Sequence, residues 1–108
     1  MSAFQRISST DAKSLIDTKD TNIVDIRDLQ SFNNGHITDA EHLDNHSLAA
    51  YINDTDHDTA LIVCCYHGNS SQSAAAYMAE QGFAEVYSLD GGFEQWAKQF
   101  PQDCEKEI

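Results

Sequence analysis

The 108-residue chain is acidic, with a formal net charge of −12 at pH 7, and 41% of its residues are hydrophobic. The charge argues against nucleic acid or an anionic membrane surface as a partner, and the hydrophobic content is typical of one globular domain. No apolar run approaches the roughly 20 residues that span a bilayer, and the N-terminal residues lack the apolar core of a signal peptide. We therefore expect one cytoplasmic domain over residues 1–108, with a short acidic tail from about residue 102.

The three cysteines, Cys64, Cys65 and Cys104, do not form a disulfide pattern. Two of them are adjacent, and neighbouring Cα atoms lie closer together than disulfide geometry favours. The chain has no Cys-x-x-Cys pair, and its single His-x-x-x-His spacing, from His42 to His46, is not taken as a metal site. We expect neither a metal nor a cofactor.

The predicted elements alternate between strand and helix. Strands are expected where β-branched and other apolar residues run together, at residues 4–7, 22–26, 40–43, 60–64 and 85–89. Helices are expected at residues 11–17, 29–34, 48–53, 70–81 and 92–100, and Thr10 and Ser47 are the expected N-caps of the first and third of them. This alternation predicts an α/β fold with a mainly parallel five-stranded sheet and helices on both faces.

The longest apolar run, residues 60–64, predicts a central strand that is buried on both faces. Cys65 follows this strand directly, and Ser70 and Ser71 open the next helix. Ligands of open α/β sheets bind at the carboxyl ends of strands, and a helix N-terminus favours thiolate over thiol. Cys65 is therefore the candidate nucleophile, and it would attack or carry an anionic group.

The loop that follows Cys65 is the predicted binding site for that group, and it consists of Tyr66, His67, Gly68, Asn69, Ser70 and Ser71. Gly68 permits a backbone conformation that would strain a bulkier residue, so the loop amides can turn toward the sulfur. No Lys or Arg lies between Asp28 and Ala97. An anionic substrate must therefore be held by backbone amides, by a helix N-terminus or by Arg27 from another strand.

Four segments, in this order along the chain, resemble the rhodanese family. They are residues 24–28 with the sequence Val-Asp-Ile-Arg-Asp, residues 32–37 followed by Ala40 and His42, the loop 65–71, and residues 89–93 with Trp96. Together they cover most of the chain. The resemblance implies a single rhodanese-like domain.

The resemblance also implies a thiosulfate sulfurtransferase. The Cys65 thiolate would take the sulfane sulfur of thiosulfate as a persulfide and pass it to cyanide or to a dithiol protein such as thioredoxin. Asp25 and Arg27 would form an ion-pair or hydrogen-bond network beside the pocket. Cys64 would pack in the core, Cys104 would be an exposed bystander in the tail, and His36 would be structural.

Two other functions remain open at this point. A cation-poor loop is compatible with a sulfur-carrier or binding module that a partner protein loads. A phosphatase or arsenate reductase is disfavoured because such relatives have a longer loop, Cys-x5-Arg, whereas the seventh position here is Ser71. Phosphoryl transfer needs cationic stabilisation of its oxygens, and this loop contains no Lys or Arg.

Overall fold

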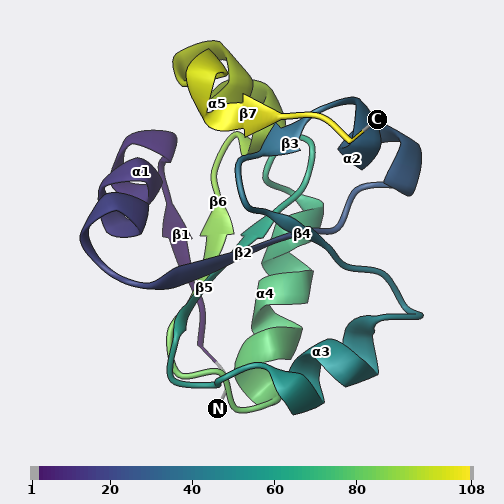
Figure 1. Cartoon of the computed structure of the whole chain (residues 1–108). Coiled ribbons are helices and arrows are strands. Elements are labelled where there is room, and N and C mark those ends of the chain that lie inside the picture. The colour runs from purple at the N-terminus through teal and green to yellow at the C-terminus, as the bar shows by residue number, and fades with distance from the viewer. Residues whose placement is uncertain (1–2, 108) are drawn as a thin grey trace.

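The computed structural model describes residues 3–107 and forms one α/β unit (Figure 1). Its elements in chain order are β1 (Gln5–Ile7), α1 (Ser9–Thr18), β2 (Thr21–Asp25), α2 (Leu29–Asn34), β3 (His36–Ile37), β4 (Glu41–His42), α3 (Leu48–Asp54), β5 (Ala60–Cys64), α4 (Ser70–Glu80), β6 (Val86–Leu89), α5 (Gly92–Gln99), the 3-10 helix η1 (Pro101–Asp103) and β7 (Cys104–Glu105). Within the described residues, no helix has the length and hydropathy needed to cross a membrane.

The main sheet has five strands in the order β1-β6-β5-β2-β4, and all of its pairings are parallel. This confirms the predicted fold class. The strand β5 lies in the middle, and all five of its residues are buried. Its last residue, Cys64, is in register with Asp25 at the end of β2. The carboxyl ends of the two strands therefore bring Cys65 and Asp25 to one edge of the sheet.

Alternation along β5 divides the core into two layers. Ile62 and Cys64 face the layer of α1, α2 and α5, whereas Leu61 and Val63 face α3 and α4 (Figure 1). The main helical contributions to the two layers are Ala12, Phe32 and Trp96 on the first face and Tyr51, Ala75 and Met78 on the second. Full burial of an aliphatic side chain such as Ile62 contributes about 1.5–3 kcal/mol. The prediction that Cys64 is a core residue is confirmed, and Trp96 is buried in the same layer.

The predicted N-cap of α1 was wrong. Ser8, not Thr10, caps this helix, because the Ser8 side chain accepts a hydrogen bond from the amide of Asp11 and leaves Thr10 inside the first turn. Residues 8–11 are Ser, Ser, Thr and Asp, all of which favour the N-cap position, so the sequence alone does not identify which of them caps the helix. Ser47 does occupy the N-cap of α3, but its hydroxyl bonds to Asp44 instead of to a helix amide.

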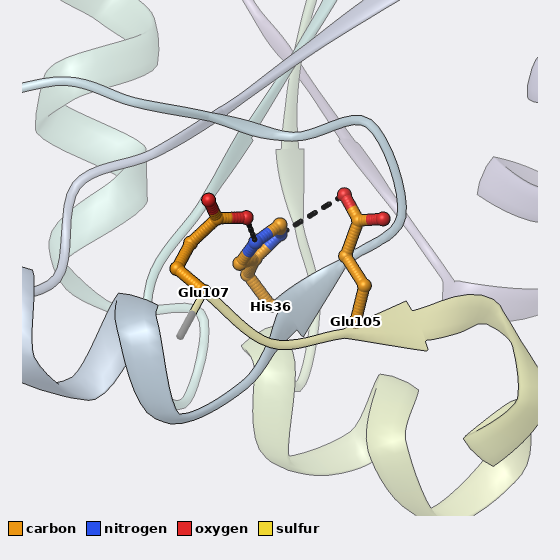
Figure 2. A group of neighbouring side chains, drawn as sticks. All are labelled: His36, Glu105 and Glu107. Atoms are coloured by element: carbon orange, nitrogen blue, oxygen red, sulfur yellow. Dashed lines mark hydrogen bonds and ion pairs between the residues drawn. The ribbon is translucent and has the colours of Figure 1, made fainter.

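The C-terminal residues are not a free tail. The strand β7 pairs antiparallel with β3, with His36 in register with Glu105 and Ile37 in register with Cys104. The interpretation of Cys104 as an exposed bystander was wrong, because its side chain is half-buried against the core, and burial raises the pKa of its thiol. Figure 2 shows Glu105 and Glu107 on either side of His36 at this seam. Two-residue strands are too short to leave a periodic signal in the sequence.

Candidate active site

Cys65 lies in the turn between β5 and α4 and is 4% exposed. Its sulfur accepts hydrogen bonds from the amides of Gly68 at 3.1 Å and Ser71 at 3.3 Å. The thiol also lies 3.3 Å from the Ser71 hydroxyl, which can turn and donate when the sulfur is ionised. The side chain of Asn69, the N-cap residue of α4, does not cap this helix. The Cys65 sulfur instead accepts a hydrogen bond from the Ser71 amide in the first turn.

These donors lower the pKa of the Cys65 thiol. Burial is the largest single influence and acts to raise this pKa, but hydrogen bonds from the Ser71 hydroxyl and from the amides of Ser71, Gly68 and His67 together outweigh it. Burial raises the pKa of the neighbouring Cys64 well above its usual range. The pKa values of the two adjacent cysteines are therefore shifted in opposite directions, which favours Cys65 as the candidate nucleophile.

Ser71 is itself held in place by a residue that the sequence did not single out. Its hydroxyl lies 2.8 Å from the hydroxyl of Ser88 in β6, and both side chains are buried. The only signal in the sequence was a polar residue inside an otherwise apolar strand, Val86-Tyr87-Ser88-Leu89. The second hydroxyl can supply or accept a proton as the charge on the sulfur changes.

Replacing Ser71 with Ala is expected to raise the pKa of Cys65, because the thiolate loses a hydroxyl donor. The rate of Cys65 alkylation by iodoacetamide rises as the thiol ionises, so in the variant this rise moves to higher pH than in the unaltered protein. Ser70→Ala is the matched control, since Ser70 is exposed and no hydrogen bond joins it to the sulfur in residues 3–107. An unchanged pH profile in Ser71→Ala contradicts the assigned role.

The N-terminus of α5 holds the outer side of the loop 65–71. The amide of Phe93 donates to the carbonyl of Cys65 at 2.8 Å, and the amide of Glu94 donates to the carbonyl of Tyr66 at 3.2 Å. The Gln72 side chain binds the carbonyl of Gly68 at 3.0 Å. These bonds turn the carbonyl oxygens of the loop away from the sulfur, which leaves the amides to face it. Gly91 and Gly92 belong to the segment 89–93 that resembles the rhodanese family, but the sequence did not predict this role for the start of α5.

Gly68 is required by the tight path of the loop. Its φ of +92° is in the left-handed region, and a Cβ there would lie 2.9 Å from the amide nitrogen of Gly91 and 3.0 Å from the carbonyl oxygen of Leu89. The loop therefore packs directly against the turn that precedes α5. This agrees with the conformational role that the sequence predicted for Gly68.

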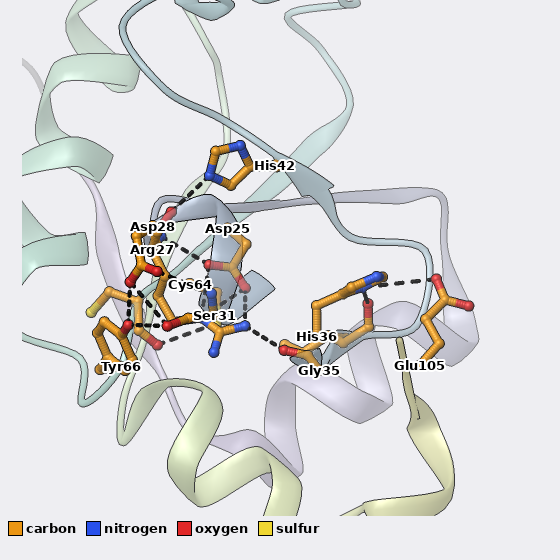
Figure 3. Close-up of polar contacts among 12 residues, drawn as sticks. Asp25, Arg27, Asp28, Ser31, Gly35, His36, His42, Cys64, Tyr66 and Glu105 are labelled. Atoms are coloured by element: carbon orange, nitrogen blue, oxygen red, sulfur yellow. Dashed lines mark hydrogen bonds and ion pairs between the residues drawn. The ribbon is translucent and has the colours of Figure 1, made fainter. Parts of the chain in front are cut away.

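Asp25 and Arg27 form a buried ion pair beside the loop, as the sequence analysis expected (Figure 3). The Arg27 Nη2 atom lies 2.7 Å from Asp25 Oδ2 and also donates to the carbonyl of Gly35 at 2.7 Å. The guanidinium carbon lies 4.3 Å from the centre of the Phe93 ring. Within the described residues, Arg27 makes no hydrogen bond to the Cys65 sulfur; its contacts bind it to the wall of the site.

Asp25→Asn is expected to destabilise the fold by about 3 kcal/mol, at the low end of the cost of breaking a buried ion pair, because Asn keeps one acceptor oxygen for Arg27. The uncompensated guanidinium charge remains buried, with Arg27 only 6% exposed. Urea denaturation followed by fluorescence of Trp96 gives the free energy of unfolding. A loss below about 1 kcal/mol contradicts this account.

Tyr66 closes the other side of the loop. Its hydroxyl bonds to Asp28, the N-cap residue of α2, and to Ser31 in the first turn, although Tyr66 as a whole is 44% exposed. Hydrogen bonds lower the pKa of the Asp28 carboxyl to about 2. The largest contribution comes from the Tyr66 hydroxyl, and smaller ones come from the amide and hydroxyl of Ser31. This anchor ties the loop to the segment that follows Arg27. Asp28 and Ser31 had no predicted role in the site.

The remaining predicted loop residues face outward. The His67 side chain is 61% exposed, and its Nδ1 atom lies 3.6 Å from Glu94 Oε1. Asn69 and Ser70 are exposed as well. The structure therefore gathers Cys65, Gly68 and Ser71 around the sulfur, while His67 contributes its backbone amide.

A low-pKa cysteine between a central parallel strand and a helix N-terminus defines a class of α/β domain suited to covalent chemistry at sulfur. The family model described as Rhodanese-like domain matches residues 8–99. The chain belongs to the rhodanese-like family, which confirms the resemblance seen in the sequence.

Close relatives carry one common name. The chain is 60% identical over 103 residues to the thiosulfate sulfurtransferase GlpE of Ectopseudomonas mendocina, which covers 95% of this chain and 94% of the relative. It is 65% identical over 83 residues to the thiosulfate sulfurtransferase GlpE of Stutzerimonas stutzeri, with coverage of 77% and 76%.

Solved structures share the fold at lower sequence identity. A rhodanese-like domain protein from Staphylococcus aureus superposes with a TM-score of 0.80 at 20% identity, covering 97% of this chain and 100% of the other. The rhodanese-like domain of the Anabaena Alr3790 protein gives 0.83 at 22% identity, with coverage of 98% and 82%. These likenesses support the fold alone.

Proposed function

We propose that this protein is a thiosulfate sulfurtransferase that uses Cys65 as its nucleophile. The observation that carries the proposal is the set of donors around the sulfur, from Gly68 and Ser71, which stabilise an anion at this position. The same donors serve a thiolate and, after sulfur uptake, an anionic persulfide. The names of the relatives at 60% and 65% identity support thiosulfate as the sulfur donor.

The reaction proceeds by double displacement. The Cys65 thiolate attacks the sulfane sulfur of thiosulfate, a Cys65 S–S bond forms, and the S–S bond of thiosulfate breaks as sulfite leaves with the electron pair. A nucleophile then attacks the outer sulfur of the persulfide. With cyanide, thiocyanate forms and the Cys65 thiolate leaves with the electron pair.

A dithiol protein such as thioredoxin is the acceptor that we propose in the cell, and the cytoplasm is the proposed location. One thiol would attack the outer persulfide sulfur, and the second would displace it as hydrosulfide while a disulfide forms. Three free cysteines suit a reducing compartment.

Steady-state kinetics test this proposal. Double-reciprocal plots of rate against thiosulfate at several cyanide concentrations should give parallel lines, because sulfite leaves before cyanide attacks. Intersecting lines contradict a persulfide intermediate. The control omits thiosulfate and should yield no thiocyanate.

A sulfur carrier loaded by a partner is the second candidate. The observation that favours it is that Asp25 neutralises Arg27, the cation beside the loop, so that thiosulfate is held mainly by amides. Robust thiosulfate turnover by the isolated protein excludes a carrier-only role. Phosphatase chemistry stays disfavoured, since Ser71 stands at the position of the Arg in the Cys-x5-Arg pattern.

A further inference from the structure

A second cluster of chemically active side chains lies at the seam between β3 and β7 (Figure 2). His36 is 1% exposed, and its ring stacks on Phe32 with the ring centroids 4.0 Å apart. Its Nε2 atom lies 2.9 Å from Glu107 Oε2, and its Nδ1 atom lies 3.8 Å from Glu105 Oε1. The ring is therefore fixed in orientation, with a carboxylate on either side.

Both ring nitrogens of His36 face oxygen acceptors. Nδ1 lies 2.8 Å from the carbonyl oxygen of Ile37, while Nε2 faces the carboxylate of Glu107. A neutral imidazole has one N–H group. When Nδ1 donates to Ile37, Nε2 presents its lone pair to a carboxylate oxygen, and a cation at that position removes the repulsion.

The charges around the cluster attract a cation. Glu105 and Glu107 bring two negative charges, and the ion pairs of residues 3–107 give neither of them a Lys or Arg partner. The amide of Asp39 donates to Glu105 Oε1 at 3.0 Å and holds that side chain near the ring. The chain as a whole carries a net charge of −12.

We propose that His36, Glu105 and Glu107 bind a divalent transition-metal ion such as Zn²⁺ or Mn²⁺. One ligand atom from each residue lies within 4.8 Å of the others. Two atoms bound to one ion at about 2.1 Å and at right angles lie about 3 Å apart, which matches the 2.9 Å between Nε2 and Glu107 Oε2. Glu105 Oε1 lies 3.8 Å from Nδ1, so the exposed Glu105 side chain has to turn toward the Nε2 side to complete the ligand set. An imidazole with two carboxylates suits these ions better than Mg²⁺ or Ca²⁺.

The bound ion would join the C-terminal segment to β3. This strand packs against α5 and directly follows Gly35, whose carbonyl accepts a hydrogen bond from Arg27. The sequence predicted no metal site because the ligands lie far apart in the chain, with His36 and Glu107 separated by 71 positions. In an extended segment, residues two apart point to the same side, and both Glu105 and Glu107 lie beside His36.

Titration with Mn²⁺, followed by NMR of the ¹⁵N-labelled full chain, tests this site. The paramagnetic ion should broaden the amide signals of residues 36–39 and 104–107 in a saturable manner, before those of residues 65–71. An equal concentration of Zn²⁺ should restore the sharp signals, whereas Mg²⁺ should not. Saturable Mn²⁺ binding should also raise the midpoint of thermal unfolding.

The variant Glu105→Gln/Glu107→Gln should lose both effects, because it removes two ligands from exposed positions without changing the buried His36. Asp54→Asn/Glu80→Gln is the matched control, since it removes the same charge from a distant part of the surface. Broadening that is spread over the acidic surface overturns the proposal. Broadening at residues 36–39 that persists in the Glu105→Gln/Glu107→Gln variant also overturns the proposal. An equal loss of this broadening in the Asp54→Asn/Glu80→Gln control overturns it as well.

Discussion

Replacing Cys65 with Ser is expected to lower thiosulfate:cyanide turnover by about 10³-fold or more, because the proposed nucleophile is then absent. A serine hydroxyl at this site stays protonated near neutral pH, and its oxygen does not replace the polarizable sulfur that carries the second sulfur atom. The donors from Gly68 and Ser71 remain in place but have no thiolate to stabilise. Thiocyanate formation at fixed thiosulfate and cyanide measures the loss.

Cys104→Ser is the matched control for this experiment. Cys104 is a free and half-buried cysteine in β7, and it takes no part in the loop 65–71. Turnover within about twofold of the unaltered protein is expected for this variant. Near-normal turnover in Cys65→Ser, or an equal loss in Cys104→Ser, contradicts the assignment of the nucleophile.

Gly92→Ala is expected to have the second large effect. The φ of Gly92 is +57°, and a Cβ at this position would overlap the carbonyl groups of Cys65 and Tyr66. Left-handed strain of about 1–2 kcal/mol and overpacking of about 1–3 kcal/mol give an expected loss of about 3 kcal/mol in the free energy of unfolding. Urea denaturation measures this loss.

The same substitution should lower turnover by about 100-fold, even at a temperature where the variant is folded. The added methyl group separates α5 from the loop, and the carbonyls of Cys65 and Tyr66 lose the amides of Phe93 and Glu94. The loop amides then lose their alignment toward the sulfur, and the loss of one such aligned donor typically costs about 10²–10³-fold in rate.

Gly35→Ala separates this effect from a general intolerance of glycine sites. Gly35 has an extended φ of 168°, and a Cβ there meets the Phe93 ring at an ordinary contact distance of 3.6 Å. Stability within about 0.5 kcal/mol and near-normal turnover are expected. If Gly92→Ala behaves like Gly35→Ala, the N-terminus of α5 does not shape the loop.

The sheet could be predicted from sequence because its strands carry strong local signals. Residues 60–64 are continuously apolar, and this strand is central and buried along its whole length. The pairing of β3 with β7 could not be predicted, since each strand has two residues and they are held together by tertiary contacts. The same reason explains why Cys104 was placed in a free tail.

The candidate site was predictable where the chemistry is local in sequence. Cys65, Gly68 and Ser71 lie within seven residues, and spacing alone placed them between a strand and a helix. Ser88 and the amides of Phe93 and Glu94 come from β6 and α5, so their contacts depend on the fold. The sequence also predicted that the loop amides could turn toward the sulfur. In the described residues the amides of Gly68 and Ser71 lie within hydrogen-bond distance of it, and the His67 amide also helps to lower the pKa of Cys65.

Intact-protein mass spectrometry tests the central claim most directly. The unaltered protein and Cys65→Ser would be measured before thiosulfate, after thiosulfate, and after a subsequent addition of cyanide. We expect a gain of one sulfur atom on the unaltered protein alone, and its removal by cyanide. A failure of thiosulfate to add sulfur, or an equal gain on Cys65→Ser, would contradict a Cys65 persulfide formed from thiosulfate.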